Sequence, residues 1–363
     1  LINKMLTHLL LHLLRVAPVE AFTPRVCGPR FLHRASCLRA CDGLEGGSFL
    51  SEREPSNVGE RALDAADAVY RFSRPHTIRG TLLACGTGVG RALVEAPQFC
   101  SLLPALLPRA MLGVLALLLA NLFIVGINQI YDVAIDEVNK PFLPIAAGRL
   151  SPKLAWAIVL ASGAGGLALV KTSFSTLIFR LYVLGATVGG PLYSIPPVQL
   201  KRFPLAAGLT IATCRGFLLN FGVYHATREA LGLAFTWSPA VSFLARFMTV
   251  YAGVIAVTKD LPDVEGDRKG GIETFAARAG PQRVADIATL VLLLNYAGAV
   301  VTALTAAAGT FRSVLMVSGH ALAATWLARS WSQLDASSSG SIKRFYKEIW
   351  NLFYFEYLMY PFI

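Results

Sequence analysis

The sequence is poor in charged residues. Only 15% of its 363 residues are Asp, Glu, Lys or Arg, whereas 55% are hydrophobic, and the mean hydropathy is +0.55. Soluble globular domains carry about 25% charged residues. This composition therefore excludes an ordinary soluble domain and indicates a membrane protein.

Cysteine motifs and long basic runs are also lacking. The six cysteines show neither the paired spacing of a zinc site nor the density of a disulfide-rich secreted domain. The net charge is +11, yet no run of Lys and Arg resembles a nucleic-acid-binding segment. We therefore expect no nucleic acid among the partners of this protein.

Long apolar stretches are abundant instead. A transmembrane helix needs about 20 apolar residues to cross roughly 30 Å of hydrocarbon, and nine stretches approach that length. We therefore predict an all-α membrane protein with nine transmembrane helices. The predicted spans are 77–95, 109–131, 153–171, 176–194, 204–223, 239–258, 284–306, 311–329 and 344–362.

The basic residues are distributed unevenly between the loops. Loops that follow even-numbered spans hold about twice as many Lys and Arg residues as the others. Lys and Arg accumulate in loops that stay on the side from which a membrane protein is inserted. The second and sixth spans are therefore predicted to end on that same side.

Residues 1–41 have the composition of a targeting leader. A short apolar run precedes Val19 and Ala21, which have the spacing of a signal-peptidase site, and the following segment is basic and free of acids. Together they resemble the signal-plus-transit leader of secondary plastids, although a tail without any targeting role is the alternative. We interpret 42–70 as a linker and 71–363 as the membrane domain.

Two acidic motifs lie just beyond apolar spans. In "NQIYDVAIDEVNKP", Asn128, Asp132 and Asp136 are four residues apart, so on a helix they share one face. In "TKDLPDVEGDRKGG", the second and later motif has aspartates at i, i+3 and i+7, which again form one helical stripe. Those aspartates are Asp260, Asp263 and Asp267.

The two motifs are predicted to face each other, because the second and sixth spans end on the same side. A solvated helix end would explain either motif alone. Five facing aspartates, however, would repel one another unless cations lay between them. Dense oxygen ligands favour Mg²⁺, which is often completed by substrate phosphates. The basic residues predicted to bind those phosphates are Lys140, Lys201, Arg202, Lys259 and Arg268.

This arrangement predicts a Mg²⁺-diphosphate site at the mouth of a helical bundle. A diphosphate whose remainder lies in lipid is an isoprenyl diphosphate. The two motifs resemble those of the UbiA superfamily of intramembrane aromatic prenyltransferases. Further segments are similar to the homogentisate branch of that family, and within it to the solanesyl-transferring enzymes. These segments are "RPHTIRGT", "YSIPPVQLKRFP", "RGFLLNFGVYHATR" and "IWNLFYFEYLMYPFI".

The resemblance implies nine transmembrane helices around a central cavity that opens to lipid. It also implies that all five aspartates bind Mg²⁺ and act in catalysis. The expected reaction is solanesyl transfer from solanesyl diphosphate to homogentisate with decarboxylation, giving 2-methyl-6-solanesyl-benzoquinol for plastoquinone. Such an enzyme would lie in a plastid membrane.

Several residues are candidates for the remaining roles in that reaction. An allylic cation needs aromatic rings around it, and the acetate of homogentisate needs a cationic partner. For the acetate we consider Arg215, His225 and Arg74. Asn220 either binds a substrate hydroxyl or forms a helix-to-helix hydrogen bond. The candidate rings, each of which could instead serve in packing, are Tyr131, Tyr193, Phe217, Phe221 and Tyr224.

Two other functions remain open from the sequence. The donor could be phytyl or geranylgeranyl diphosphate, as in tocopherol synthesis, because a motif does not report the length of the chain. The protein could also be a non-enzymatic carrier that binds a divalent cation. A carrier would place acids near the bilayer midplane, whereas both motifs lie at the ends of spans.

Overall fold

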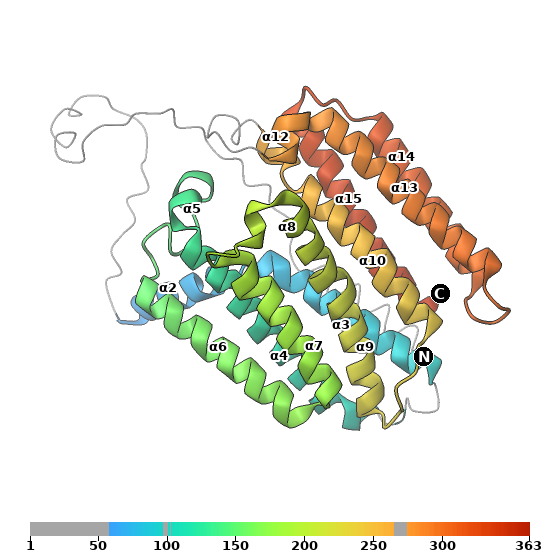
Figure 1. Cartoon of the computed structure of the whole chain (residues 1–363), viewed down its shortest axis with the longest axis horizontal. Helices are drawn as coiled ribbons and strands as arrows, with labels where there is room; N and C mark the ends of the chain where they lie inside the picture. The colour runs from blue at the N-terminus through green and yellow to red at the C-terminus, as the bar shows by residue number, and fades with distance from the viewer. Residues whose placement is uncertain (1–57, 97–100, 102, 265–273) are drawn as a thin grey trace. The chain divides into compact units, whose positions relative to one another are not determined.

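The computed structural model describes residues 58–96, 101, 103–264 and 274–363 (Figure 1). By its internal contacts the chain divides after Asp64, and residues 65–363 form one unit. The predicted leader, 1–41, and the first part of the linker lie outside the described residues. The predicted domain boundaries after residues 41 and 70 therefore stay predictions.

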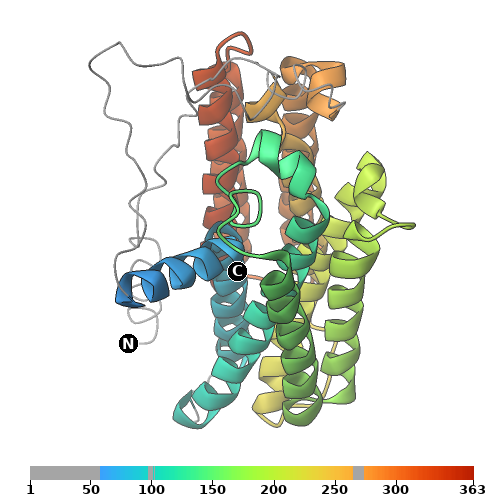
Figure 2. The same cartoon turned by 90° about the vertical axis from the view of Figure 1, so that its left-hand side faces the viewer.

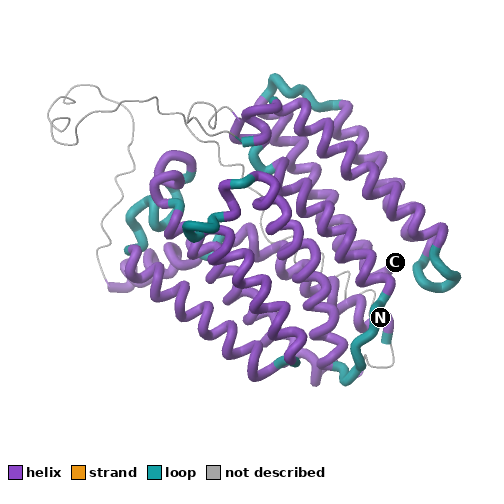
Figure 3. Tube along the Cα trace, viewed as in Figure 1, coloured by secondary structure: helices purple, strands orange, loops and turns teal. Residues whose placement is uncertain are grey.

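The described residues form helices joined by loops, with no β-strand among them (Figure 3). This confirms the predicted all-α class. The longer elements are α2 (Val58–Phe72), α3 (Pro75–Glu95), α4 (Leu103–Tyr131), α6 (Pro152–Ser173), α7 (Thr176–Thr187), α8 (Pro204–Ile211), α9 (Leu219–Ala230), α10 (Pro239–Thr258), α13 (Pro281–Thr305), α14 (Ser313–Ser332) and α15 (Ser339–Met359).

Short helical elements connect or extend the long ones. Two of them are π-helical, η2 (Val188–Leu192) after α7 and η4 (Ala212–Leu218) between α8 and α9. Because no loop interrupts α8, η4 and α9, they form one rod. The others are α5 (Val133–Asn139), η3 (Leu200–Arg202), η5 (Leu261–Asp263), α12 (Phe275–Ala279) and η6 (Tyr360–Phe362).

Helices cover each of the nine ranges predicted as membrane spans. Among the residues that the structure describes, five helices are long and apolar enough to cross a membrane, and Thr176–Leu192 is apolar but shorter. The count of nine spans therefore stays a prediction. The five are Leu103–Tyr131, Pro152–Ser173, Leu205–Ala230, Pro239–Thr258 and Pro281–Thr305.

Proline and serine residues mark the starts of several long helices. A proline in the first turn costs no hydrogen bond, because the N–H groups there have no partner within the helix. The Ser151 hydroxyl also accepts a hydrogen bond from the Leu154 N–H and so caps α6. The helices that begin with a proline are α3, α6, α8, α10 and α13.

The long helices lie side by side, as Figures 1 and 2 show. Helix α4 packs against α6, α3 against α9, and α10 against both η4 and α13. A buried cluster that includes Phe72, Ile127 and Val159 joins α2, α4 and α6, and each of these three side chains is at most 2% exposed. This cluster holds the end of α4 in place, close to the first acidic motif.

The rod of α8, η4 and α9 approaches α10 most closely at a glycine. A Cβ on Gly216 would lie 2.4 Å from the Cα atom of Thr249. Backbone atoms cannot turn aside as a side chain can, so any residue other than glycine would force the two helices apart. Small residues commonly permit such close crossings in membranes. The crossing therefore fixes the position of η4, which carries Arg215.

We expect Gly216→Ala to lower the free energy of unfolding by about 1–3 kcal/mol, because the added methyl group overpacks this crossing. The measurement is denaturant or thermal unfolding of the purified protein in detergent. Gly222→Ala in the same rod is the matched control, since a Cβ there meets nothing within 4 Å. Equal losses in the two variants would contradict the role of Gly216.

Candidate active site

The first acidic motif lies where α4 ends and α5 begins. Asn128 belongs to the last turn of α4, Asp132 is the residue between the two helices, and Asp136 lies within α5. The sequence predicted one continuous helical face, but the chain bends at Asp132. The Asp136 N–H still donates to the Asp132 carbonyl oxygen over 2.7 Å, so the bend keeps the two aspartates one turn apart.

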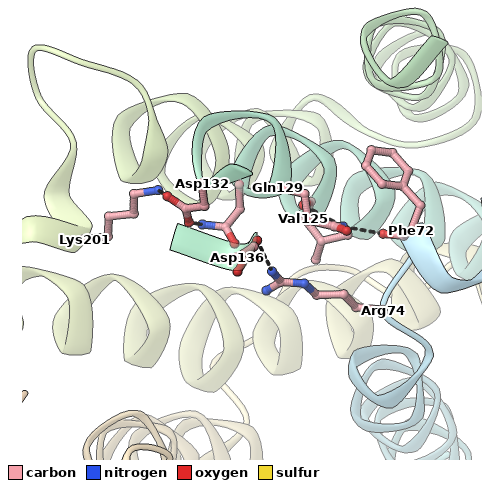
Figure 4. Close-up of polar contacts among 8 residues, drawn as sticks. Phe72, Arg74, Val125, Gln129, Asp132, Asp136 and Lys201 are labelled. Atoms are coloured by element: carbon pink, nitrogen blue, oxygen red, sulfur yellow. Dashed lines mark hydrogen bonds and ion pairs between the residues drawn. The ribbon is translucent and has the colours of Figure 1, made fainter. Parts of the chain in front are cut away.

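Both carboxylate oxygens of Asp132 have partners (Figure 4). The Asn128 side-chain amide donates to Oδ2 over 2.7 Å. The Lys201 ammonium group forms a hydrogen-bonded ion pair with Oδ1. Lys201 comes from η3, which follows the loop containing Pro196 and Pro197, so this loop supplies the cation that neutralises the first aspartate.

Asp136 has a weaker partner and is more deeply buried. Its side chain is 8% exposed, and Oδ2 lies 3.8 Å from a guanidinium nitrogen of Arg74. That oxygen accepts no hydrogen bond from the described residues. Burial raises the pKa of the Asp136 carboxyl, while the positive charges of Arg74 and Lys140 oppose the rise. A buried carboxylate oxygen without a hydrogen bond is suited to receive a metal ion or another strong cation.

Arg74 is held in an unusual backbone conformation. Its φ of 50° lies in the left-handed region, which costs a residue other than glycine of order 1 kcal/mol or more. It stands at the junction of α2 and α3, directly before Pro75. Strain of this kind persists where the surroundings fix the residue, and here it accompanies the ion pair between Arg74 and Asp136.

The second acidic motif begins at the end of α10. Asp260 follows Lys259 there and precedes η5. The charges of Asp260, Asp132 and Lys259 all act on the hydroxyl of Tyr193, which follows η2. The structure thus brings the first aspartates of both motifs near one tyrosine. The Asp263 side chain, Asp267 and Arg268 lie outside the described residues.

The carboxylates of the two acidic motifs are hard oxygen donors, the kind of ligand that Mg²⁺ prefers. No three His, Cys, Asp or Glu residues in the described ranges are close enough to hold a metal ion together. The open oxygen of Asp136 and the carboxylate chemistry nevertheless fit Mg²⁺, which prefers oxygen ligands and keeps several waters. Asp132, Asp136 and Asp260 could each supply an oxygen to such ions, with substrate phosphates, waters and the predicted ligands Asp263 and Asp267 completing the coordination.

The remaining basic candidates belong to α5, η3 and α10 or follow them directly. Lys140 caps the end of α5 and is exposed, as are Arg202 and Lys259. Among them, Lys140 adds to the positive potential at Asp136, and Lys259 to that at Tyr193. With Lys140, the cations Arg74 and Lys201 bring positive charge to the first acidic motif.

Two candidates lie deeper, on the rod of α8, η4 and α9. Arg215 donates to the Thr81 hydroxyl over 2.9 Å and to the Asn121 side-chain oxygen over 3.0 Å. The Asn220 amide donates to the carbonyl oxygens of Arg215 and Gly216 within its own rod. The Asn220 side chain also has a hydrogen bond with the Tyr357 hydroxyl of α15, so it makes the helix-to-helix contact that the sequence offered as one interpretation.

His225 and most of the candidate aromatic residues lie away from the acidic motifs. His225 is ten residues beyond Arg215, about 15 Å farther along the rod, between the rings of Phe221 and Phe235. Tyr224 binds Glu95 at that same end. Phe217 stacks on Phe221 at a centroid distance of 5.3 Å, whereas Tyr131 packs on Trp156. Of the predicted aromatic residues, Tyr193 is the one whose hydroxyl is acted on by the charges of an aspartate from each acidic motif.

Sequence reasoning missed the polar groups that support this region. Gln129 is 1% exposed and donates to the Phe72 carbonyl oxygen over 2.7 Å, which ties α2 to α4. Asn121 donates to the Ser73 carbonyl oxygen over 3.0 Å. A lone amide within the apolar run "LLLANLFIV" was the available signal, because such a group in lipid requires a partner.

The chain is similar in sequence to known prenyltransferases. The model of the UbiA prenyltransferase family matches residues 84–353. The chain is 48% identical to a probable homogentisate phytyltransferase 2 of Oryza sativa subsp. japonica, over 96% of this chain and 90% of that one. It is 47% identical to homogentisate solanesyltransferase of Arabidopsis thaliana, over 91% of this chain and 84% of that one.

A solved structure shares the fold. A UbiA homologue from Archaeoglobus fulgidus bound to GPP and Mg²⁺ superposes with a TM-score of 0.56. The superposition covers 80% of this chain and 99% of that one, at 18% sequence identity. At that identity the likeness shows a common helical fold and no more.

The ion pair of Lys201 with Asp132 predicts competition with metal. Lys201→Gln should strengthen Mn²⁺ binding about two- to fivefold in the absence of a diphosphate, because a competing cation is removed. Electron paramagnetic resonance of free Mn²⁺ with purified protein gives the affinity. Arg202→Gln, which changes an exposed neighbouring charge, should leave the affinity as it was. Unchanged or weaker binding in Lys201→Gln would refute the competition.

Proposed function

Because this chain belongs to the UbiA prenyltransferase family, we propose that it transfers a solanesyl group from solanesyl diphosphate to homogentisate in a Mg²⁺-dependent reaction. The acetate loses CO₂, and the product is 2-methyl-6-solanesyl-benzoquinol, which feeds plastoquinone synthesis. One observation carries the proposal. Asp132 and Asp136, paired with Lys201 and Arg74, lie at the end of an apolar helix in a chain 47% identical to a homogentisate solanesyltransferase.

The acidic motifs would hold the metal. Asp132, Asp136 and Asp260 supply oxygen ligands from the described part of the chain, and we assign the same role to Asp263 and Asp267. When bound, Mg²⁺ neutralises the charge that develops on the departing diphosphate. The chain itself fixes where this happens, because the bend at Asp132 keeps the two first-motif carboxylates adjacent.

Lys201 and Arg74 would exchange partners when the substrate binds. Each now neutralises one carboxylate. When a metal ion and a diphosphate bind together, the two carboxylates would bind the metal ion. Lys201 and Arg74 would then bind phosphate oxygens. Lys140, Arg202 and Lys259 extend the positive surface, and Arg268 is assigned to it from the sequence. Metal and diphosphate should therefore bind more tightly together than separately.

The transfer exchanges the allylic C–O bond of the donor for a C–C bond to the acceptor ring. The allylic C–O bond breaks, and the diphosphate leaves with the electron pair. A ring carbon of homogentisate forms the new C–C bond and loses its proton. The acetate side chain loses CO₂ and takes up one proton, which leaves a methyl group. Tyr193 would face the allylic cation with its ring, and the surrounding apolar helices would exclude water from that cation.

The donor has one alternative. The rice relative that is 48% identical is described as a probable homogentisate phytyltransferase, so phytyl diphosphate is the second candidate, with geranylgeranyl diphosphate beside it. The segments "GINQIYD" and "LNFGVYHATR" favour the solanesyl branch. The carrier hypothesis is set aside, because the family to which the chain belongs consists of prenyltransferases.

We also propose a multi-pass location in a plastid membrane. The rice and Arabidopsis relatives are both described as chloroplastic, and the helices long and apolar enough to cross a membrane account for multiple passes. Membrane lipid is then the constant partner of the protein. A secondary plastid stays a prediction from the composition of the N-terminal segment.

Asp132→Asn and Asp260→Asn should each lower turnover by at least about 100-fold, because each removes a charged ligand from the diphosphate site. Membranes with each variant are supplied with homogentisate, Mg²⁺ and labelled solanesyl diphosphate, and the labelled quinol is counted. Asp286→Asn is the control, since Asp286 is bonded to Gln282 and Trp331 on α13 and α14. Near-normal turnover in both site variants would remove the metal assignment.

Donor selection is tested with the unaltered protein. Solanesyl, phytyl and geranylgeranyl diphosphates are compared at equal concentrations with homogentisate in the same membranes, and kcat/KM is measured for each. We expect solanesyl diphosphate to give the highest value. A preference for phytyl diphosphate would move the protein to the tocopherol pathway and keep the acceptor assignment.

A further inference from the structure

One half-buried cation within the membrane-length helices lacks a carboxylate partner among the described residues. Arg215 lies in η4, at the middle of the rod Leu205–Ala230. Its guanidinium group donates to the Thr81 hydroxyl, the Thr77 carbonyl oxygen and the Asn121 side-chain oxygen. Among the described residues no Asp or Glu lies within ion-pair distance of it. All the acceptors it contacts are neutral.

Other shielded arginines of this chain have carboxylate partners. Arg91 lies 3.0 Å from a carboxylate oxygen of Glu95, and Arg228 lies 3.8 Å from the other oxygen of the same carboxylate. Arg74 pairs with Asp136. A charged side chain within a membrane is costly and is usually retained for function. The contrast indicates that none of the described carboxylates is the anion for Arg215, so a ligand could supply it.

The position of Arg215 relates it to the acidic site. Its partners Thr77 and Thr81 follow Arg74 by three and seven residues on α3, about 4.5 and 10.5 Å along the helix axis. Asn121, its third partner, also donates to the Ser73 carbonyl oxygen beside Arg74. The guanidinium group of Arg215 therefore lies one to two helical turns deeper than the pair of Arg74 and Asp136.

A second polar group in this region has an unused acceptor. Asn220 is 1% exposed, and its side-chain oxygen accepts no hydrogen bond from the described residues. Its amide nitrogen is already committed to the carbonyl oxygens of Arg215 and Gly216 and to the hydroxyl of Tyr357. The rod thus offers one cation and one acceptor, five residues apart, and the acceptor suits a ligand that carries a hydroxyl group.

We propose that Arg215 binds the carboxylate of the aromatic acceptor, with Asn220 accepting a hydrogen bond from a ring hydroxyl. The ligand class is a small aryl acid with a hydroxyl group, and this site rests on the proposed function because homogentisate belongs to that class. A carboxylate at Arg215 replaces the neutral acceptors Thr81 and Asn121. The aromatic ring then lies between Arg215 and the acidic motifs, on the path of the allylic carbon.

The test compares homogentisate with its methyl ester, which has the same ring and hydroxyl groups without the charge. Binding of each to the purified full chain is measured by calorimetry without any prenyl donor. We expect the unaltered protein to bind the acid about 10- to 100-fold more tightly, the size of one charge-assisted contact. Arg215→Gln should reduce this ratio to near one.

Two further variants keep the test decisive if Arg215→Gln does not fold. Asn121→Asp places a carboxylate beside the guanidinium group and should abolish the preference for the acid while it adds an ion pair to the fold. Arg228→Gln removes a shielded guanidinium group at the far end of the same rod and should keep the preference. An unchanged ratio in Asn121→Asp, or in a folded Arg215→Gln variant, would overturn the proposal.

Transfer assays separate this site from the proposed function. If the unaltered protein prefers the acid in binding but transfers no prenyl group to it, the carboxylate site stands and the proposed reaction fails. If it prenylates the acid and the ester equally well, the reaction stands and the carboxylate site fails.

Discussion

The structure depends on how charges are neutralised at the ends and in the middle of apolar helices. Charged groups near hydrocarbon require partners, and this chain draws those partners from distant segments. Lys201 from η3 reaches Asp132, and Arg74 from the start of α3 reaches Asp136. These two pairs hold together the end of α4, the start of α3 and the loop after η2. The chemistry of the site and its stability therefore rest on the same contacts.

The sequence predicted much of this region because its signals are local. Regular spacing identified Asn128, Asp132 and Asp136, and hydropathy placed each long helix within a few residues. The bend at Asp132 was not predicted, since four-residue spacing fits one helix as well as two. The role of Arg74 also escaped, because its ion pair with Asp136 joins residues 62 positions apart. Contacts of that range depend on packing, which periodicity does not report.

The residues predicted to bind the acetate of the aromatic acceptor also required the structure to tell them apart. Arg215, His225 and Arg74 were equivalent from sequence, since each is a cation near a predicted helix. The structure separates them by depth and by partner, because Arg74 pairs with Asp136 and His225 lies between aromatic rings at the far end of its rod. The helices α3, α14 and α15 illustrate a different limit. The sequence counted them as membrane spans, but they are not among the five described helices long and apolar enough to cross a membrane, so that part of the count stays a prediction.

The π-helical segment η4 has a consequence for how this protein could have arisen. A π turn amounts to one residue inserted into an α-helix, and one residue corresponds to about 100° of rotation. The insertion sets α8, which precedes η4, out of phase with α9, which carries Tyr224 and His225. A deletion of one residue within 212–218 would swing Tyr224 away from Glu95. The faces that α8 and α9 present to their neighbours can therefore be set separately only while this irregular turn is kept.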